Sequence, residues 1–294
     1  MSEEDIFIQK IYGFKKIEKQ QIAGVEYGLF DFNKFQEKFD DPGNNENIFI
    51  YGRSGEGKSM FANLILFTKV MSNIQNKKKT IVSALSDSSD AHYTILKLSE
   101  IACHFYPELK DTWDTSECLL ECYHTNLAGF DAFKDELDSY KTKDKAELHR
   151  VFKLWYLDDI GLLFSDRHKN AKEFFDLLAS NSRHYNISCI LNSQKVEIPP
   201  IVITQVRTVA IIGPSGEKDL KFLINKGSIQ LNTLTSKAQS RFIKEINKHY
   251  LTSKSFNILL FRNEEGEKCF FFKTSSLFIK MWNEITPEQM RPKL

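Results

Sequence analysis

The sequence predicts an α/β fold in which a mostly parallel β-sheet has helices on both faces and a C-terminal antiparallel hairpin. Short apolar, β-prone runs alternate with segments of helical periodicity through the middle of the chain, which is the pattern of consecutive β-α units. These runs are almost continuously apolar, as strands buried on both faces are. Two further β-prone runs flank Asn263-Glu264-Glu265-Gly266, which is typical of a hairpin turn.

The elements follow in a regular order. Strands are predicted at residues 48–51, 80–85, 151–160, 187–191 and 208–212, with hairpin strands at 256–261 and 269–272. Helices are predicted at residues 59–71, 91–106, 169–183, 218–225 and 235–250. We divide the chain into an N-terminal extension (1–42) of short strand or helix pieces, one α/β domain (43–275) with a mainly helical insertion at about 87–150, and a C-terminal tail (276–294).

Composition narrows the function classes. Of 294 residues, 41% are hydrophobic, which is enough for a sizeable core, and the formal net charge is +1. With so small a net charge, any contact with nucleic acid must come from a local patch or from assembly. Five cysteines, an acidic N-terminus and the absence of a long apolar run predict a soluble protein of a reducing compartment, neither secreted nor bound to a membrane.

A complete phosphate-binding motif follows the first predicted strand. The spacing G-x-x-x-x-G-K-[ST] is matched in full by Gly52, Arg53, Ser54, Gly55, Glu56, Gly57, Lys58 and Ser59. The glycines allow backbone N–H groups to converge on phosphate oxygens. Lys58 places a positive charge on the β- and γ-phosphates, and the Ser59 hydroxyl ligates magnesium. We therefore expect ATP and Mg²⁺ to bind at this loop.

Two acids end the third predicted strand, in Leu154-Trp155-Tyr156-Leu157-Asp158-Asp159. We expect Asp158 to hold magnesium, directly or through water, and Asp159 to orient or deprotonate the attacking water. Only one acid is needed for the metal, so the pair favours hydrolysis over simple nucleotide binding.

Polar residues also end the fourth predicted strand. Because ligands lie at the carboxyl ends of parallel strands, Gln194 is the candidate sensor of the γ-phosphate, with Asn192 as the second candidate. Arg183 precedes this strand and is either an arginine finger for a neighbouring subunit or a cation that balances a helix dipole. Arg53 and Arg207 are further candidates for the finger.

Two other clusters carry weaker signals. The spacing Cys118-x-x-x-Cys122-x-His124 is irregular for zinc and lacks a second ligand pair. The basic run 77–79 is a candidate for DNA contact only if it lines a pore, and is otherwise a solvated loop.

At these residues the chain resembles the FtsK–HerA superfamily of P-loop ATPases, and most of all the poxvirus-type genome-packaging ATPases of viruses and virophages. The resemblance covers residues 45–215. It rests on the phosphate loop, Leu157-Asp158-Asp159-Ile160-Gly161, Ser182-Arg183-His184-Tyr185-Asn186-Ile187-Ser188, and the run through Gln194 to Ile198-Pro199-Pro200. Many relatives have Glu where this chain has Asp159, so the shorter side chain is a departure from the family pattern.

The resemblance implies a RecA-like core that forms a ring, often a hexamer, around double-stranded DNA and uses ATP to move a genome into a preformed capsid. It assigns nucleotide and metal binding to Lys58 and Ser59, magnesium to Asp158, the catalytic base to Asp159, the sensor to Gln194 and a trans finger to Arg183. A capsid or portal-vertex protein is a further expected partner, and the host cytoplasm (a viral factory) or the virion is the expected location. A ring helicase or helicase loader and a non-motor regulatory NTPase switch are the alternatives.

Overall fold

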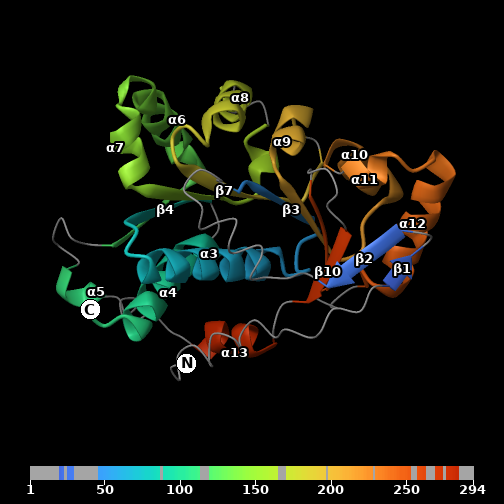
Figure 1. Ribbon diagram of the computed structural model, residues 1–294, viewed down its shortest axis with the longest axis horizontal. Coiled ribbons are helices and arrows are strands. Elements are labelled where there is room, and N and C mark those ends of the chain that lie inside the picture. The colour runs from blue at the N-terminus through green and yellow to red at the C-terminus, as the bar shows by residue number, and fades with distance from the viewer. Residues whose placement is uncertain are drawn as a thin grey trace.

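The computed structural model describes residues 20–22, 25–29, 46–86, 89–112, 119–164, 170–196, 198–227, 229–252, 257–262, 269–273 and 276–284 (Figure 1). Within these ranges a single ten-stranded sheet has the strand order β1-β2-β10-β9-β8-β3-β7-β6-β4-β5. Its strands are β1 (Gln20–Ile22), β2 (Val25–Leu29), β3 (Ile48–Gly52), β4 (Thr80–Leu85), β5 (Leu120–Thr125), β6 (Phe152–Leu157), β7 (Ile187–Ser193), β8 (Thr208–Ile212), β9 (Asn257–Arg262) and β10 (Cys269–Lys273).

Six adjacent strands of this sheet, from β8 to β5, run parallel. Strand β9 is antiparallel to β8 and to β10, so the C-terminal hairpin extends the sheet as predicted. Strand β2 pairs in parallel with β10, and β1 is antiparallel to β2. The predicted α/β fold, with its mostly parallel sheet and antiparallel hairpin, is confirmed.

Helices cover both faces of the sheet (Figure 1). The α-helices are α3 (Lys58–Gln75), α4 (Ser89–Phe105), α5 (Leu109–Thr112), α6 (Phe130–Ser139), α7 (Lys145–Arg150), α8 (Ala171–Asn181), α9 (Pro200–Gln205), α10 (Glu217–Gly227), α11 (Ile229–Asn232), α12 (Ser236–His249) and α13 (Ser276–Glu284). Three short 3₁₀ helices are η1 (Leu127–Gly129), η2 (Tyr140–Thr142) and η3 (Ile160–Leu162).

Alternation along the strands divides the core into two layers. Ile48 and Ile50 of β3 face a cluster that includes side chains of α3, α4 and α13, whereas Phe49 and Tyr51 face a cluster with side chains of α6 to α12. Helix α3 is buried along most of its length. The phosphate loop therefore joins a strand and a helix that both lie in the interior.

The sequence prediction differs from the structure at the margins. The segment expected to be mainly helical contains the edge strand β5, in which Leu120 alone is buried and the other side chains are partly or fully exposed. That pattern gives no apolar run to detect. Residues 276–284, expected as part of a tail, form α13, whose Phe278 and Trp282 are buried.

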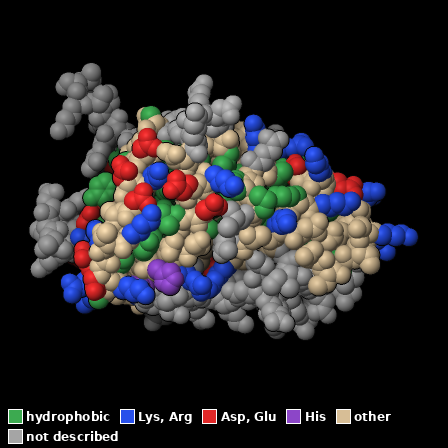
Figure 2. All heavy atoms as spheres, turned by 90° about the horizontal axis from the view of Figure 1, so that it is seen from above, with side chains coloured by type: hydrophobic (Ala, Val, Ile, Leu, Met, Phe, Trp, Pro, Cys, Tyr) green, Lys and Arg blue, Asp and Glu red, His purple; other side chains and the backbone are tan. Residues whose placement is uncertain are grey.

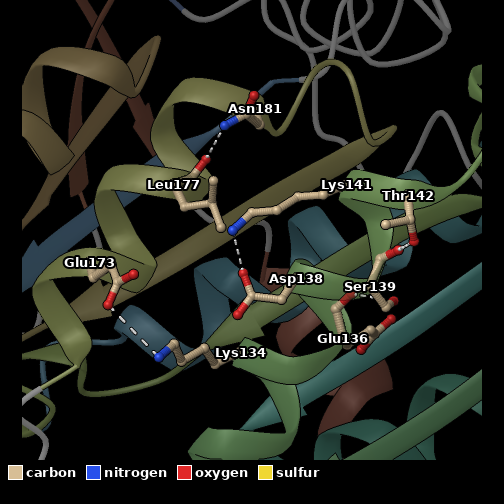
Figure 3. A network of polar contacts seen from close by, with 9 residues as sticks. All are labelled: Lys134, Glu136, Asp138, Ser139, Lys141, Thr142, Glu173, Leu177 and Asn181. Carbon is tan, nitrogen blue, oxygen red and sulfur yellow. Dashed lines mark hydrogen bonds and ion pairs between the residues drawn. The ribbon is translucent and has the colours of Figure 1, made fainter.

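The helical layer on one face can be seen from above in Figure 2. Acidic and basic side chains are mixed at the end formed by α6 and α7, whereas the opposite end is mostly basic. Within this layer Lys134 of α6 and Glu173 of α8 form an ion pair at 3.8 Å, and Lys141 pairs with Asp138 at 2.6 Å (Figure 3). Such surface pairs contribute roughly 0–1 kcal/mol each, so buried aromatic packing does more to hold α6 against α8.

In the part of the chain that the structure describes, no helix is both long enough and apolar enough to span a membrane.

Asn47, just ahead of β3, ties three segments together at the amino-terminal edge of the sheet. Its side-chain amide donates to the Ser182 hydroxyl at 2.9 Å, and its Oδ1 accepts from the Cys189 backbone N–H at 3.0 Å. Its carbonyl accepts from the backbone N–H groups of Arg207 and Thr208. This one buried side chain fixes the start of β7 and the end of α8 relative to the strand that leads into the phosphate loop.

Asn47→Ala should lower the free energy of unfolding by about 1–3 kcal/mol, because the buried Cys189 N–H loses its acceptor. Urea denaturation measures this loss. Asn126→Ala is the matched control, since Asn126 is exposed and, within the described ranges, its side chain accepts a local bond from the Gly129 N–H. Equal stability of the two variants would contradict the role of Asn47.

Candidate functional site

The phosphate loop connects the end of β3 to the start of α3. Gly55 and Gly57 have φ angles of 81° and 96°, a region that side chains with a Cβ rarely adopt. A Cβ on Gly52 would lie 2.5 Å from the Ile212 carbonyl oxygen of the neighbouring strand. Three of the motif's positions therefore require glycine for the loop to take this shape.

Lys58 begins α3 and is largely buried, with 8% of its surface exposed. Its Nζ donates to the Arg53 carbonyl at 2.9 Å, which holds the ammonium group across the loop. Burial lowers the pKa of Lys58 below its usual value, and the nearby Asp158, Asp159 and Glu56 carboxylates act in the opposite direction. The loop thus holds a partly desolvated cation that a phosphate can compensate.

Asp158 lies at the carboxyl end of β6, and its carboxylate accepts hydrogen bonds from two other strands. The Ser86 hydroxyl, just after β4, lies 3.3 Å from Oδ2, and the Asn192 amide donates to Oδ1 at 3.1 Å. The Asp158 backbone N–H donates to the Leu85 carbonyl at 3.0 Å. These contacts fix the carboxylate in one orientation.

Tyr156 lies beside the residues expected to hold magnesium. Its buried hydroxyl accepts a hydrogen bond from the Asn192 side-chain amide at 3.0 Å, and Ser59 and Asp158 lie close enough to influence its pKa. Burial, followed by the charge of Asp158, raises the pKa of Tyr156 well above its usual value, so the hydroxyl keeps its proton. The Asn192 amide therefore joins this buried phenol to the acid of β6, because it donates to both Tyr156 and Asp158.

Asp159 has a left-handed backbone, with φ 50° and ψ 45°, and so its side chain leaves the line of the strand. The Gln194 side-chain amide donates to its Oδ2 at 3.2 Å. Burial and the neighbouring Asp158 raise the pKa of Asp159, whereas Lys58, Gln194 and Lys195 oppose this shift. A carboxylate with a raised pKa is a better proton acceptor, which suits the base expected from the sequence.

The strand order explains why these groups meet. Strand β7 lies between β3 and β6, and the register pairs Tyr51 with Ser193 and Leu157 with Leu191. All three strands are parallel, so their carboxyl ends lie at the same edge. The phosphate loop, the two acids and the polar end of β7 consequently form one site.

The donor set at this edge suits magnesium. The Ser59 hydroxyl and the Asp158 carboxylate are hard oxygen ligands of the kind that Mg²⁺ takes together with waters. The buried Asn192 Oδ1 has no hydrogen-bond partner, and a metal-bound water could donate to it. Among the described residues there is no group of three or more His, Cys, Asp or Glu that could hold a metal. Cys118 lies outside the described residues, and Cys122 and His124 lie on β5.

The three candidate arginines lie at two different edges. Arg53 is exposed within the phosphate loop. Arg183 is exposed in the turn between α8 and β7, and Arg207 directly precedes β8. Arg183 and Arg207 therefore lie at the amino-terminal edge, about 20 Å from the site along the seven-residue β7 and about 17 Å along the five-residue β8, respectively. Arg183 and Arg207 cannot act on the nucleotide of their own chain, and Arg53 can.

The turn that carries Arg183 is firmly held. Asn186 has a left-handed φ of 56°, and its side-chain amide donates to the Val151 carbonyl at 3.0 Å. The buried Lys153 donates to the Tyr185 carbonyl at 3.0 Å. The basic run 77–79 lies at the same amino-terminal edge, ahead of β4, where Lys79 pairs with Glu121 at 2.6 Å.

Sequence reasoning identified the loop, Asp158, Asp159, Asn192 and Gln194, and the structure brings all of them together. The sequence patterns did not indicate Tyr156 or Ser86, which also lie at this site. Tyr156 stands in an apolar run that predicts a buried strand, but it lies two positions before Asp158 and so faces the same side of that strand. Ser86 carries no local signal, because only the pairing of β4 with β6 places it beside Asp158.

Comparison with solved structures shows that the chain has the fold of P-loop ATPases. The structure superposes on EssC (ATPases 2 and 3) from Geobacillus thermodenitrificans with a TM-score of 0.50 and 13% identity, over 88% of this chain and 44% of that one. No protein-family model matches the sequence, and no curated protein is similar to it.

The particular neighbours include a viral protein, the genome packaging NTPase B204 from Sulfolobus turreted icosahedral virus 2. Its complex with ATP-gammaS is 16% identical, with a TM-score of 0.47, over 80% of this chain and 99% of that one. Its complex with AMP is 18% identical, with a TM-score of 0.49, over 78% and 98%. At these identities the likeness to the solved structures is one of fold.

Asp159→Asn should stabilise the nucleotide-free protein at neutral pH, because it removes a charge that burial and, after it, the neighbouring Asp158 disfavour, while asparagine tolerates the left-handed backbone. Folding raises the pKa of Asp159, so the folded wild type is favoured while this carboxyl is protonated. The wild type loses that part of its free energy of unfolding as the pH rises through the raised pKa. Thermal melts should show a larger advantage of the variant at about pH 7 than at about pH 4.

Asp159→Ala is the control for this effect. It removes the same charge but places a Cβ-bearing residue without a polar side chain in the left-handed region, at a cost of about 1 kcal/mol. A melting temperature of Asp159→Asn below that of the wild type at neutral pH would contradict the claim that the Asp159 charge destabilises the nucleotide-free protein.

Proposed function

We propose that this protein is an ATP-hydrolysing motor that translocates double-stranded viral DNA into a preformed capsid, as a member of the FtsK–HerA superfamily. One observation supports hydrolysis above all: Gln194 donates to Asp159 at the edge where Lys58 and Asp158 lie. The resemblance of residues 182–200 to viral packaging ATPases supports DNA as the substrate of the motor.

Each side chain has a defined role in this proposal. Lys58 neutralises the β- and γ-phosphates, and Ser59 with Asp158 holds Mg²⁺, which supplies charge stabilisation when bound. Asp159 accepts the proton of the attacking water. Gln194 senses the γ-phosphate and, through its contact with Asp159, links that sensing to the base.

The alternatives explain fewer of these contacts. A regulatory NTPase switch needs nucleotide binding but not a base held by a sensor, so the Gln194–Asp159 contact counts against it. A ring helicase or helicase loader shares the same site and is separated from a packaging motor by its substrate. Strand separation of a forked duplex by the pure protein would favour the helicase.

The proposed assembly is a ring, often a hexamer in similar proteins, around double-stranded DNA. A capsid or portal-vertex protein is its proposed docking partner, and a viral factory in the host cytoplasm or the virion is its proposed location. A ring adds a few phosphate contacts from each subunit, so a net charge of +1 is compatible with DNA binding.

Duplex DNA should stimulate ATP hydrolysis by the wild-type protein, because a translocating motor couples turnover to its track. Steady-state phosphate release with and without blunt duplex DNA measures this. Lys58→Ala and Asp159→Asn are the controls: the first should lose nucleotide binding, and the second should bind ATP but release phosphate slowly. Turnover that duplex DNA leaves unchanged at every salt concentration would contradict the motor.

Arg183 is proposed as the finger that completes the site of a neighbouring subunit. It is exposed, its turn is anchored by Asn186 and Lys153, and it lies too far from its own phosphate loop. A guanidinium held this way at one edge can reach a nucleotide at the opposite edge only in another copy of the chain.

Mixing Arg183→Ala with Asp159→Asn should raise ATP hydrolysis well above the rate of either variant alone, because the Asp159→Asn subunit still offers Arg183 to its neighbour. The matched control mixes Arg183→Ala with the double variant that carries both changes, and this mixture should stay inactive. If the first mixture also stays inactive, Arg183 is not a trans finger.

A further inference from the structure

Helix α12 carries a continuous basic stripe on its exposed face. Lys237, Arg241, Lys244 and Lys248 follow one another at intervals of four, three and four residues, and all four are exposed. With 3.6 residues per turn, these intervals place the four side chains on one side of the helix. The buried side consists of Gln239, Phe242, Ile243 and Ile246.

The stripe concentrates charge that the chain as a whole lacks. Four cations and one acid, Glu245, give α12 a formal charge of +3, whereas the chain carries +1, so the remaining residues carry −2. Arg241 pairs with Glu245 at 3.1 Å. Within the described ranges no ion pair involves Lys237, Lys244 or Lys248. Glu217 of α10 lies near the stripe, with its pKa lowered first by a hydrogen bond from Lys221, then by Ser240, and also by the charge of Lys244.

The dimensions of the stripe fit a nucleic-acid backbone. From Lys237 to Lys248 the helix rises about 16 Å, and a DNA strand carries one phosphate per about 3.4 Å of axis. The stripe can therefore lie along about five phosphates of one strand. In Figure 2 basic side chains gather at the end of the molecule where Figure 1 places α10 to α12.

The short loop 213–216, between β8 and α10, lies between α12 and the phosphate loop. The Asn247 side chain donates to the Ser215 carbonyl at 2.7 Å and accepts from the Ser215 N–H at 3.2 Å. Two residues earlier, Gly213 has a φ of 73°, and a Cβ there would lie 2.7 Å from the Glu56 side chain. Residues 213–216 thus contact the phosphate loop on one side and the basic helix on the other.

We propose that the exposed face of α12 binds the sugar-phosphate backbone of double-stranded DNA, and that residues 213–216 couple this contact to the nucleotide site. The proposal rests on the proposed motor function and assigns its DNA-binding surface. Long cationic side chains bind phosphates by charge, so the contact is independent of sequence. Movement of the phosphate loop against Gly213 shifts Ser215, and through Asn247 shifts the helix that holds the DNA.

The first test replaces all four cations with glutamine, which keeps the helix propensity. Binding of a labelled duplex is measured by fluorescence anisotropy in the presence of Mg-ATPγS, between about 50 and 300 mM salt. Each lost phosphate contact should reduce the slope of log affinity against log salt by about 0.9, so the variant should lose about 3–4 of the wild-type slope. The matched control replaces four exposed cations elsewhere, namely Lys145, Arg150, Lys172 and Lys280.

The outcomes separate this proposal from the motor function. A wild type that binds no duplex overturns both. A wild type that binds duplex with a salt-dependent affinity, together with an α12 variant of unchanged slope, overturns only the α12 surface. A slope lost equally in the control variant also overturns it, because the effect then comes from net charge.

The second test addresses the coupling through Asn247→Ala, with the exposed Asn232→Ala as control. The Asn247 variant should bind duplex DNA as the wild type does, yet lose DNA stimulation of ATP hydrolysis by about fivefold or more. Full stimulation in this variant would overturn the coupling through residues 213–216.

Discussion

Strand β7 lies between the strand that leads into the phosphate loop and the strand that ends in Asp158, and the chemistry of the site depends on this insertion. Without β7, the loop and the acids would end neighbouring strands with nothing polar between them. With it, Asn192 reaches Asp158 and Gln194 reaches Asp159. Parallel pairing on both sides of β7 requires its two flanking strands to end at the same edge.

The site places two neighbouring carboxylates, Asp158 and Asp159, beside a partly buried lysine, and this arrangement lowers the stability of the nucleotide-free protein. Burial lowers the pKa of Lys58, and burial with its neighbour raises the pKa of Asp159. The left-handed backbone of Asp159 adds strain of the kind that is found at functional sites. Two buried layers of apolar packing, one on each face of the sheet, offset these costs. A nucleotide with its metal would relieve the same imbalance, because phosphates compensate Lys58 and a cation compensates the acids.

The sequence allowed the central strands, the phosphate loop and the acids to be predicted because each depends on local patterns. Almost continuous apolar runs mark β3, β6 and β8, and glycine spacing marks the loop. Features that depend on pairing between distant strands could not be predicted from local patterns. Strand β5 is half-exposed and carries no apolar signal, and Ser86 reaches Asp158 only through the pairing of β4 with β6. Likewise, the edge at which Arg183 lies follows from the direction of β7 in the sheet, which the local sequence does not give.

A double-mutant cycle of Asp159→Asn and Gln194→Ala, read as single-turnover ATP hydrolysis, tests most directly whether β7 completes the site. If Gln194 acts through its contact with Asp159, the double variant should be about as slow as the slower single variant, because the two side chains work as one unit. Rate losses that simply multiply would show that the two residues act independently, and would contradict a catalytic site assembled by β7.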